Sequence, residues 1–129
     1  MDTNQAPDHE TILLVDDDST TRTVLRTQLE QEGYNVLEAS NGNVALAVSE
    51  RHSGPIHMLL TDLMMPRMSG LELSQRLAAV RKGLRVLCIS AYVDDSMVRA
   101  MLQYSRIDFM AKATTSLVVR KVRELLNAS

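Results

Sequence analysis

The chain has 129 residues, of which 45% are hydrophobic and 23% are charged, values that suit one domain built around a single core. Its formal net charge of −2 argues against direct nucleic-acid binding, and no apolar stretch approaches the roughly 18 residues that span a bilayer. The single cysteine, Cys88, cannot form an intramolecular disulfide, and the first residues lack the pattern of a signal peptide. We therefore expect a cytoplasmic protein with no direct membrane partner.

Strand and helix patterns alternate along the chain after residues 1–10, which are polar and are expected to form a flexible tail. In chain order, the expected elements are a strand at 12–15, a helix after Asp18 or Ser19, a strand at 34–38, a helix after Asn41, a strand at 58–60, a helix after Ser69, a strand at 86–89, a helix after Asp95, a strand at 107–110 and a helix after Thr114 or Thr115. Each helix start carries a side-chain oxygen that can accept free backbone N–H groups.

Three of these strands, at 12–15, 58–60 and 86–89, are continuous apolar runs. Such runs are typical of strands buried on both faces of a parallel sheet. The runs at 34–38 and 107–110 mix polar and apolar residues and fit edge strands.

Glycines follow the first three expected helices, at Gly33, Gly54 and Gly83, where a positive φ is often required. The whole alternation predicts an α/β fold, with a doubly wound, parallel five-stranded sheet in a (βα)5 arrangement. We expect one domain, spanning residues 11–127.

Polar side chains follow four of the expected strands. They are Asp16, Asp17 and Asp18 after the first strand, Asp62 after the third, Ser90 after the fourth and Lys112 after the fifth. Because sites in such sheets form outside the carboxyl ends of the strands, we expect these side chains to share one rim.

Clustered carboxylates repel one another unless a cation is present, and Mg²⁺ favours oxygen ligands together with phosphate oxygens. One of the carboxylates can then act as a nucleophile and form an aspartyl phosphate, with Lys112 and Ser90 stabilising the phosphoryl oxygens. Each residue also has a simpler explanation. The three consecutive carboxylates would suit any helix N-terminus, where Asp18 is the expected cap, and Lys112 alone would suit a solvated surface.

Four motifs in this chain closely resemble those of the receiver domains of bacterial two-component response regulators. They are residues 12–18, with the paired Asp16-Asp17, residues 60–70, with Asp62 followed by Met65-Pro66 and Gly70, residues 89–91, and residues 109–112. The resemblance covers about residues 11–127, nearly the whole chain. It implies a flavodoxin-like sheet with the strand order 2-1-3-4-5.

The resemblance also implies the chemistry. Asp62 would be the phosphoacceptor, and the Mg²⁺ ligands would be Asp17, Asp62 and the backbone carbonyl of Met64, with Asp16 acting largely through water. Lys112 would pair with the phosphoryl group.

Two further residues would carry the signal. Ser90 would be the switch hydroxyl that moves to the phosphoryl group, and Phe109 the aromatic that turns inward with it, although packing alone is the simpler role for Phe109.

The partners implied are a sensor histidine kinase or phosphotransfer protein, and an unidentified output protein or domain that binds through residues 95–127. The chain would catalyse only its own phosphorylation and dephosphorylation, without an independent substrate. The segments 54–95 and 121–126 look particularly like receivers attached to hybrid sensor histidine kinases, so the chain could be a stand-alone receiver or part of a larger protein.

Two positions depart from the family pattern. Ala113 follows Lys112 where the family usually has a proline in a cis peptide bond, and a cis bond before a residue other than proline costs about 2.5–4 kcal/mol. We therefore predict a trans bond between Lys112 and Ala113. The usual glycine before the fifth strand is also missing, near Ser105 and Arg106.

Two other functions compete with this interpretation. A phosphorylation-independent pseudo-receiver, which would be a binding module, gains support from Ala113. A haloacid-dehalogenase-like phosphatase would explain the spacing of Asp16, Asp18 and Thr20. However, such a phosphatase has its lysine before its acidic pair, whereas in this chain the acidic pair comes first. A calcium loop would need a glycine where Thr21 stands. A zinc site would need more ligands than the one cysteine and three scattered histidines of this chain provide.

Overall fold

Parallel strands and helices alternate in the computed structural model, which describes residues 9–91, 99 and 106–127. Within these ranges the elements are β1 (Thr11–Val15), α1 (Ser19–Gln31), β2 (Asn35–Ala39), α2 (Gly42–Arg51), β3 (Met58–Asp62), α3 (Gly70–Val80), β4 (Arg85–Ser90), β5 (Ile107–Ala111) and α5 (Thr115–Asn127). The helix expected after Asp95 lies outside the described residues, as does most of the segment 95–105.

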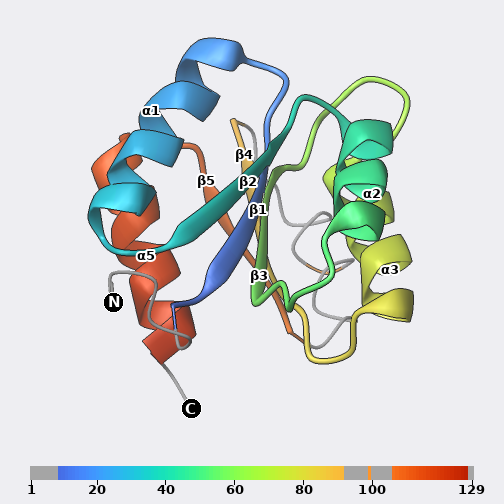
Figure 1. Ribbon diagram of the computed structural model, residues 1–129. Coiled ribbons are helices and arrows are strands. Elements are labelled where there is room, and N and C mark those ends of the chain that lie inside the picture. Colours follow the sequence, from blue (N-terminus) through green and yellow to red (C-terminus); the bar gives the residue numbers. More distant parts are fainter. Residues whose placement is uncertain (1–8, 92–98, 100–105, 128–129) are drawn as a thin grey trace.

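All strand pairs in the sheet are parallel, and the strand order is β2-β1-β3-β4-β5. This confirms the doubly wound, flavodoxin-like arrangement and places the two mixed runs, β2 and β5, at the edges. Figure 1 shows α1 and α5 on one face of the sheet and α2 and α3 on the other. Because every strand runs in the same direction, all the strand carboxyl ends meet at one edge of the sheet.

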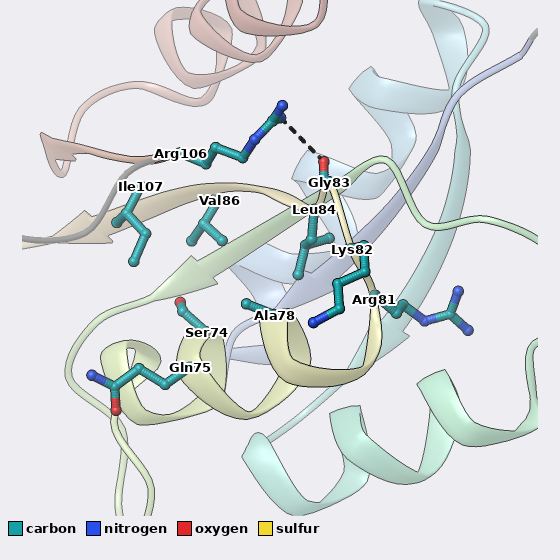
Figure 2. Close-up of a pocket in the computed structure, with 10 residues that line it drawn as sticks. All are labelled: Ser74, Gln75, Ala78, Arg81, Lys82, Gly83, Leu84, Val86, Arg106 and Ile107. Atoms are coloured by element: carbon teal, nitrogen blue, oxygen red, sulfur yellow. Dashed lines mark hydrogen bonds between the residues drawn. The ribbon is translucent and has the colours of Figure 1, made fainter.

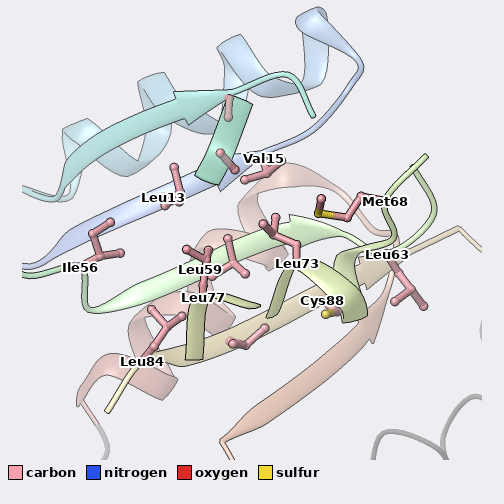
Figure 3. Packing of buried hydrophobic residues seen from close by; sticks show 13 residues of the cluster. Leu13, Val15, Ile56, Leu59, Leu63, Met68, Leu73, Leu77, Leu84 and Cys88 are labelled. Atoms are coloured by element: carbon pink, nitrogen blue, oxygen red, sulfur yellow. The ribbon is translucent and has the colours of Figure 1, made fainter. Parts of the chain in front are cut away.

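The central strands are buried on both faces because their side chains alternate between two hydrophobic clusters. Leu13, Val15 and Leu59 face α2 and α3 (Figure 3). Their neighbours Leu14 and Leu60 face α1 and α5. This two-sided burial explains why these strands are continuous apolar runs in the sequence, and it holds the strand ends rigidly in place.

Three helices begin at the residues expected from the sequence. The side chain of Asp18 accepts a hydrogen bond from the backbone N–H of Thr20 at the start of α1. Asn41 and Ser69 cap α2 and α3 in the same way. Each cap satisfies a backbone donor that has no partner within the helix.

The glycine prediction holds at two of its three positions. Gly33 and Gly83 adopt positive φ values of 97° and 81°, but Gly54 does not, so that expectation was wrong. The reason is that α2 ends in a different way. Arg81 donates hydrogen bonds to the carbonyls of Ser49, His52 and Gly54 at 2.7–2.9 Å, and these bonds replace a left-handed glycine cap.

The turn before β5 keeps the backbone shape of a glycine although the glycine is absent. Arg106 has a φ of 69°, in the left-handed region that favours glycine. No cis peptide bond occurs among the described residues, which include Lys112 and Ala113. This confirms the expected trans bond between these two residues.

Candidate functional site

The acidic residues lie at the ends of two neighbouring strands. Val15 pairs with Thr61 at the end of the β1–β3 ladder, so the next residues, Asp16 and Asp62, emerge side by side. Asp17 follows in the turn that leads to α1. One carboxylate oxygen from each of the three residues lies within 4.8 Å of the others. The pairing of β1 with β3 therefore assembles the predicted cluster from positions far apart in the sequence.

Asp16 is held by backbone contacts on the β1 side of the cluster. Its N–H donates to the carbonyl of Ala39, at the end of β2, at 3.2 Å. Its Oδ1 accepts a 2.8 Å hydrogen bond from the N–H of Asp18. Only 7% of Asp16 is exposed, whereas Asp17 is exposed. The cluster thus has a buried floor and an open rim.

The turn after Asp62 is tightly fixed on the β3 side. The N–H of Leu63 donates to the carbonyl of Ile89, in β4, at 2.7 Å, and the N–H of Gly70 donates to the carbonyl of Leu63 at 2.8 Å. The N–H of Met64 approaches Asp62 Oδ1 at 3.4 Å. The side chain of Met64 is 67% exposed, so its predicted contribution is that of the backbone alone.

The electrostatics of the cluster are those of a site that needs a cation. Burial, followed by repulsion from Asp16, raises the pKa of Asp62 above its ordinary value of 3.8. Burial also raises the pKa of Asp16, and the charges of Asp17 and Asp18 add to the rise. The positive charge of Lys112 opposes the rise at both residues. A bound cation would relieve the repulsion and favour the ionised form of these carboxylates.

Asp18 stands apart from this group. Its Oδ2 accepts a 2.6 Å hydrogen bond from the hydroxyl of Thr21. That bond and the N–H of Thr20 lower its pKa. Asp18 is therefore the helix cap, as expected, and the remaining three carboxylates form the candidate metal site.

Ser90 and Lys112 lie at the ends of the neighbouring strands, β4 and β5. Ser90 is 2% exposed, and its carbonyl accepts a 2.6 Å hydrogen bond from the N–H of Lys112. This bond extends the β4–β5 ladder beyond the pair formed by Ser90 and Ala111. It therefore fixes the backbone of Lys112 at the same rim as the carboxylates.

Phe109 lies within β5, opposite Cys88 of β4. Its ring is half-buried and packs against the hydrophobic cluster on the α2 and α3 face. This contact fits the packing role, while the switching role of Phe109 stays a prediction.

The donor set fits Mg²⁺. Three carboxylates supply hard oxygen ligands from two directions, and the exposed side of Asp17 leaves room for water and phosphate oxygens. The described part of the chain offers no sulfur or imidazole ligand in this cluster, so a softer metal would find poorer partners.

A separate cavity of about 320 Å³ lies between α3 and the starts of β4 and β5 (Figure 2). Its floor includes Val86 and Ile107, and Arg106 donates to the carbonyl of Gly83 across one side at 3.3 Å. This cavity is at the amino ends of the strands, whereas the acidic cluster is at their carboxyl ends. It therefore plays no part in the candidate site.

The sequence predictions missed one residue that contacts the site. Arg22, in α1, donates from Nη1 to the backbone carbonyl of Asp16 at 2.6 Å. A side chain that binds a backbone atom leaves no motif, and an arginine on a helix is ordinarily read as a surface residue. Only the tertiary structure reveals this contact.

The sequence matches the family model of the response regulator receiver domain over residues 12–123. It is 36% identical over 116 residues to an uncharacterised 14.6 kDa protein of Leptolyngbya boryana, covering 88% of this chain and 87% of that protein. It is 34% identical over 102 residues to a cyclic di-GMP phosphodiesterase of Thermotoga maritima, covering 79% of this chain but 27% of that protein. The match to the sensor kinase CckA of Brucella abortus, at 29% identity, covers 79% of this chain and 11% of the kinase.

Solved structures agree with these matches. The receiver domain of the hybrid histidine kinase CckA has a TM-score of 0.76 and 27% identity, covering 91% of this chain and 99% of that one. The response regulator TrrA of Thermotoga maritima, solved in complex with Mg(2+)-BeF, has a TM-score of 0.75 and 27% identity, covering 90% of this chain and 98% of that one. No helix in the described part of the chain is long and apolar enough to cross a membrane. The chain belongs to the response regulator receiver domains, the phosphoacceptor modules of two-component signalling.

Proposed function

We propose that Asp62 accepts a phosphoryl group from a phosphohistidine on a sensor histidine kinase or phosphotransfer protein. The observation that carries this proposal is the cluster of Asp16, Asp17 and Asp62 oxygens within 4.8 Å of one another. Asp62 ends its strand on the rim of this cluster, where a partner can approach it. In this proposal the chain catalyses only its own phosphorylation and dephosphorylation.

In the transfer step, one carboxylate oxygen of Asp62 attacks phosphorus in line with the phosphohistidine nitrogen. The new O–P bond forms as the N–P bond breaks, and the leaving electron pair stays on the imidazole nitrogen, which then takes up a proton. Asp16, Asp17, Asp62 and the carbonyl of Met64 would hold Mg²⁺, which when bound neutralises phosphoryl oxygens.

Lys112 would approach the remaining phosphoryl charge from the β5 side. Its charge already acts on both Asp16 and Asp62. The hydroxyl of Ser90, at the end of β4, would donate to another phosphoryl oxygen. These two residues come from strands on the far side of Asp62 from Asp16, so the phosphoryl group would be held between them and the metal.

Transmission of the signal would start at Ser90 and pass to β5 and α5. The carbonyl of Ser90 is bonded to the N–H of Lys112, so a shift of Ser90 would move the end of β5 directly. Phe109 lies on the same strand, opposite Cys88. We propose that the output protein or domain binds within residues 95–127, which include β5 and α5.

Two of the similar proteins support these details. The structure of TrrA holds Mg(2+)-BeF, and beryllium fluoride has the tetrahedral shape of a phosphoryl group. The similarity to the receiver of a hybrid histidine kinase supports a kinase or a phosphotransfer protein as the partner.

The decisive test is the intact mass of the protein after incubation with Mg²⁺ and a small phosphodonor such as phosphoramidate. We expect a gain of one phosphoryl group, lost when EDTA removes Mg²⁺ and absent in Asp62→Asn. Asp108→Asn, which changes a carboxylate on β5, is the matched control and should be phosphorylated normally. If neither donors nor kinases modify the wild-type protein, the pseudo-receiver function replaces this proposal.

A further inference from the structure

Arg22 projects from the first turns of α1 toward the end of β1, where it touches the backbone of the acidic site. We propose that Arg22 is a positioning residue for the metal site, which acts by fixing the peptide plane between Asp16 and Asp17. This inference rests on the proposed function, because it concerns the Mg²⁺ site of that proposal. It assigns to the site a residue that binds no metal and no phosphate.

The guanidinium of Arg22 makes a short hydrogen bond to the site and a second bond to a neighbouring strand. Nη1 of Arg22 donates to the carbonyl oxygen of Asp16 at 2.6 Å. Nε of the same guanidinium donates to Oε1 of Glu38, on β2, at 3.3 Å. The side chain of Arg22 is only 18% exposed, so bulk water does not readily replace these bonds. The planar guanidinium therefore bridges the end of β1 and the adjacent edge strand.

The carbonyl that Arg22 binds belongs to the peptide group joining two of the three clustered carboxylate residues, Asp16 and Asp17. The N–H on the other side of Asp16 is held by the carbonyl of Ala39, and its Oδ1 is held by the N–H of Asp18. With Arg22 in place, Asp16 is fixed at its N–H, its carbonyl and its carboxylate. Without Arg22, the carbonyl of this peptide would lose that partner, and a rotation of the peptide would move the Asp17 carboxylate away from the cluster.

The effect depends on geometry more than on charge. Arg22 donates to the neutral backbone carbonyl of Asp16, and the carboxylate in its ion pair is that of Glu38, outside the cluster. Partners that orient metal ligands from outside typically change metal affinity by about 10- to 100-fold. We expect the lower end of that range, because Asp16 keeps its other two bonds when Arg22 is removed.

Arg26 provides a matched control within the same network. It lies one turn further along α1, and its Nη1 donates to Oε2 of Glu38 at 2.8 Å. It thus shares the carboxylate partner, the helix and the residue type of Arg22. The hydrogen bonds found for Arg26 do not include Asp16. Arg26→Ala therefore removes a comparable ion pair and leaves the peptide plane between Asp16 and Asp17 untouched.

The test is a titration of the full chain with MgCl2, without any phosphodonor, followed through the backbone amide signals of Asp17 and Asp62 by NMR. Arg22→Ala should weaken Mg²⁺ binding by about tenfold, while Arg26→Ala should stay within about twofold of wild type. Arg22→Lys keeps the positive charge but lacks the planar guanidinium that donates to two partners at once. It should therefore lose most of the Mg²⁺ affinity that Arg22→Ala loses. It also serves as the reporter if Arg22→Ala does not fold.

Phosphorylation by phosphoramidate gives a second readout. The rate in the Arg22 variants should approach the wild-type rate when Mg²⁺ is raised about tenfold, because a positioning defect changes metal affinity and not the nucleophile. Equal Mg²⁺ affinity in Arg22→Ala and wild type, or an equal loss in Arg26→Ala, would overturn the inference and leave the proposed function standing. A wild-type protein that binds no Mg²⁺ would overturn both.

Discussion

Gly70 lies directly against the backbone of Asp62, and a Cβ atom at Gly70 would stand 2.5 Å from the carbonyl oxygen of Asp62. The same Cβ would meet the Cα of Leu63 at 3.0 Å. These neighbours are backbone atoms that are already fixed by hydrogen bonds to Ile89 and to Gly70 itself. Glycine is therefore needed at this position because α3 begins in contact with the turn that carries Asp62, the proposed phosphoacceptor.

We predict that Gly70→Ala displaces this turn. The loss of stability should be about 1–3 kcal/mol, as for other overpacked sites, and both Mg²⁺ binding and phosphorylation of Asp62 should fall. Gly54→Ala is the control, since its Cβ would meet only the side chain of His52, at 3.3 Å. Denaturant unfolding and phosphoramidate labelling measure the two effects. A Gly70→Ala protein with wild-type labelling would contradict the close-packing argument.

The raised pKa values of Asp16 and Asp62 predict that these two groups destabilise the metal-free protein less as the pH falls. A carboxyl group whose pKa is higher in the folded state binds its proton more tightly there than in the unfolded chain. Its stabilising effect is full below the ordinary value of 3.8 and is lost as the pH rises through the folded pKa. At neutral pH these ionised groups therefore destabilise the metal-free fold.

Asp16→Asn should consequently raise the melting temperature of the metal-free protein by a few degrees at pH 7. The same variant should lose most of the stabilisation that the wild type gains from millimolar Mg²⁺. Thermal unfolding in EDTA and in MgCl2 measures both. Asp108→Asn should change neither, and a lower melting temperature for Asp16→Asn in EDTA would refute the repulsion argument.

Cys88 should be unreactive in the folded protein. The thiol is 1% exposed, and burial raises its pKa from 9.0 to about 11. We expect no labelling by a disulfide reagent at pH 8 in native buffer, and one label per chain in denaturant. Labelling of the native protein at the rate of a free thiol would show that β4 opens far more often than its burial implies.

The same thiol predicts a loss of stability at high pH. Between pH 9 and 11 the unfolded thiol ionises more than the folded one, whose pKa is about 11, so the free energy of unfolding should fall by about 2 kcal/mol. Comparison with Cys88→Ala isolates this effect, because Tyr34, whose pKa is also raised by burial, is present in both proteins. If the free energy of unfolding fell equally with pH in the two proteins, Cys88 would not be the cause of the loss of stability.

Arg106 should be a point of backbone strain. Its φ of 69° costs a residue with a Cβ about 1–2 kcal/mol, which glycine avoids. Arg106→Gly should therefore stabilise the protein, although the gain is reduced by the loss of the 3.3 Å bond to the carbonyl of Gly83. Arg106→Ala is the control, because it loses that bond and keeps the strain, and it should be less stable than wild type. Urea unfolding of the wild type and the two variants measures the order of their stabilities.

The order of elements and the positions of the site residues could be predicted from the sequence because they depend on local patterns. Continuous apolar runs indicated the central strands, and Asp18, Asn41 and Ser69 indicated helix starts through their capping oxygens. The family motifs indicated which strand ends would carry the proposed chemistry, and the structure places these strand ends at one edge of the sheet. These signals all lie within a few residues of the feature that they predict.

Other features depend on contacts between distant segments, and only the tertiary structure decided them. Gly54 did not need a positive φ, because Arg81 reaches across from the end of α3 and satisfies the carbonyls that end α2. The contact of Arg22 with Asp16 is likewise made to a backbone atom. Side chains that bind backbone atoms impose no residue type on their partner, so no sequence pattern records them.

The sequence by itself thus determined that this protein is a receiver with Asp62 at the end of a buried strand. Only the tertiary structure decided how closely Asp16, Asp17 and Asp62 approach one another, since that distance is set by the pairing of β1 with β3. It also decided why Gly70 cannot be replaced, because the contact with Asp62 arises only when α3 packs against the sheet. Local preferences select the elements, whereas close packing between them sets the geometry on which the chemistry depends.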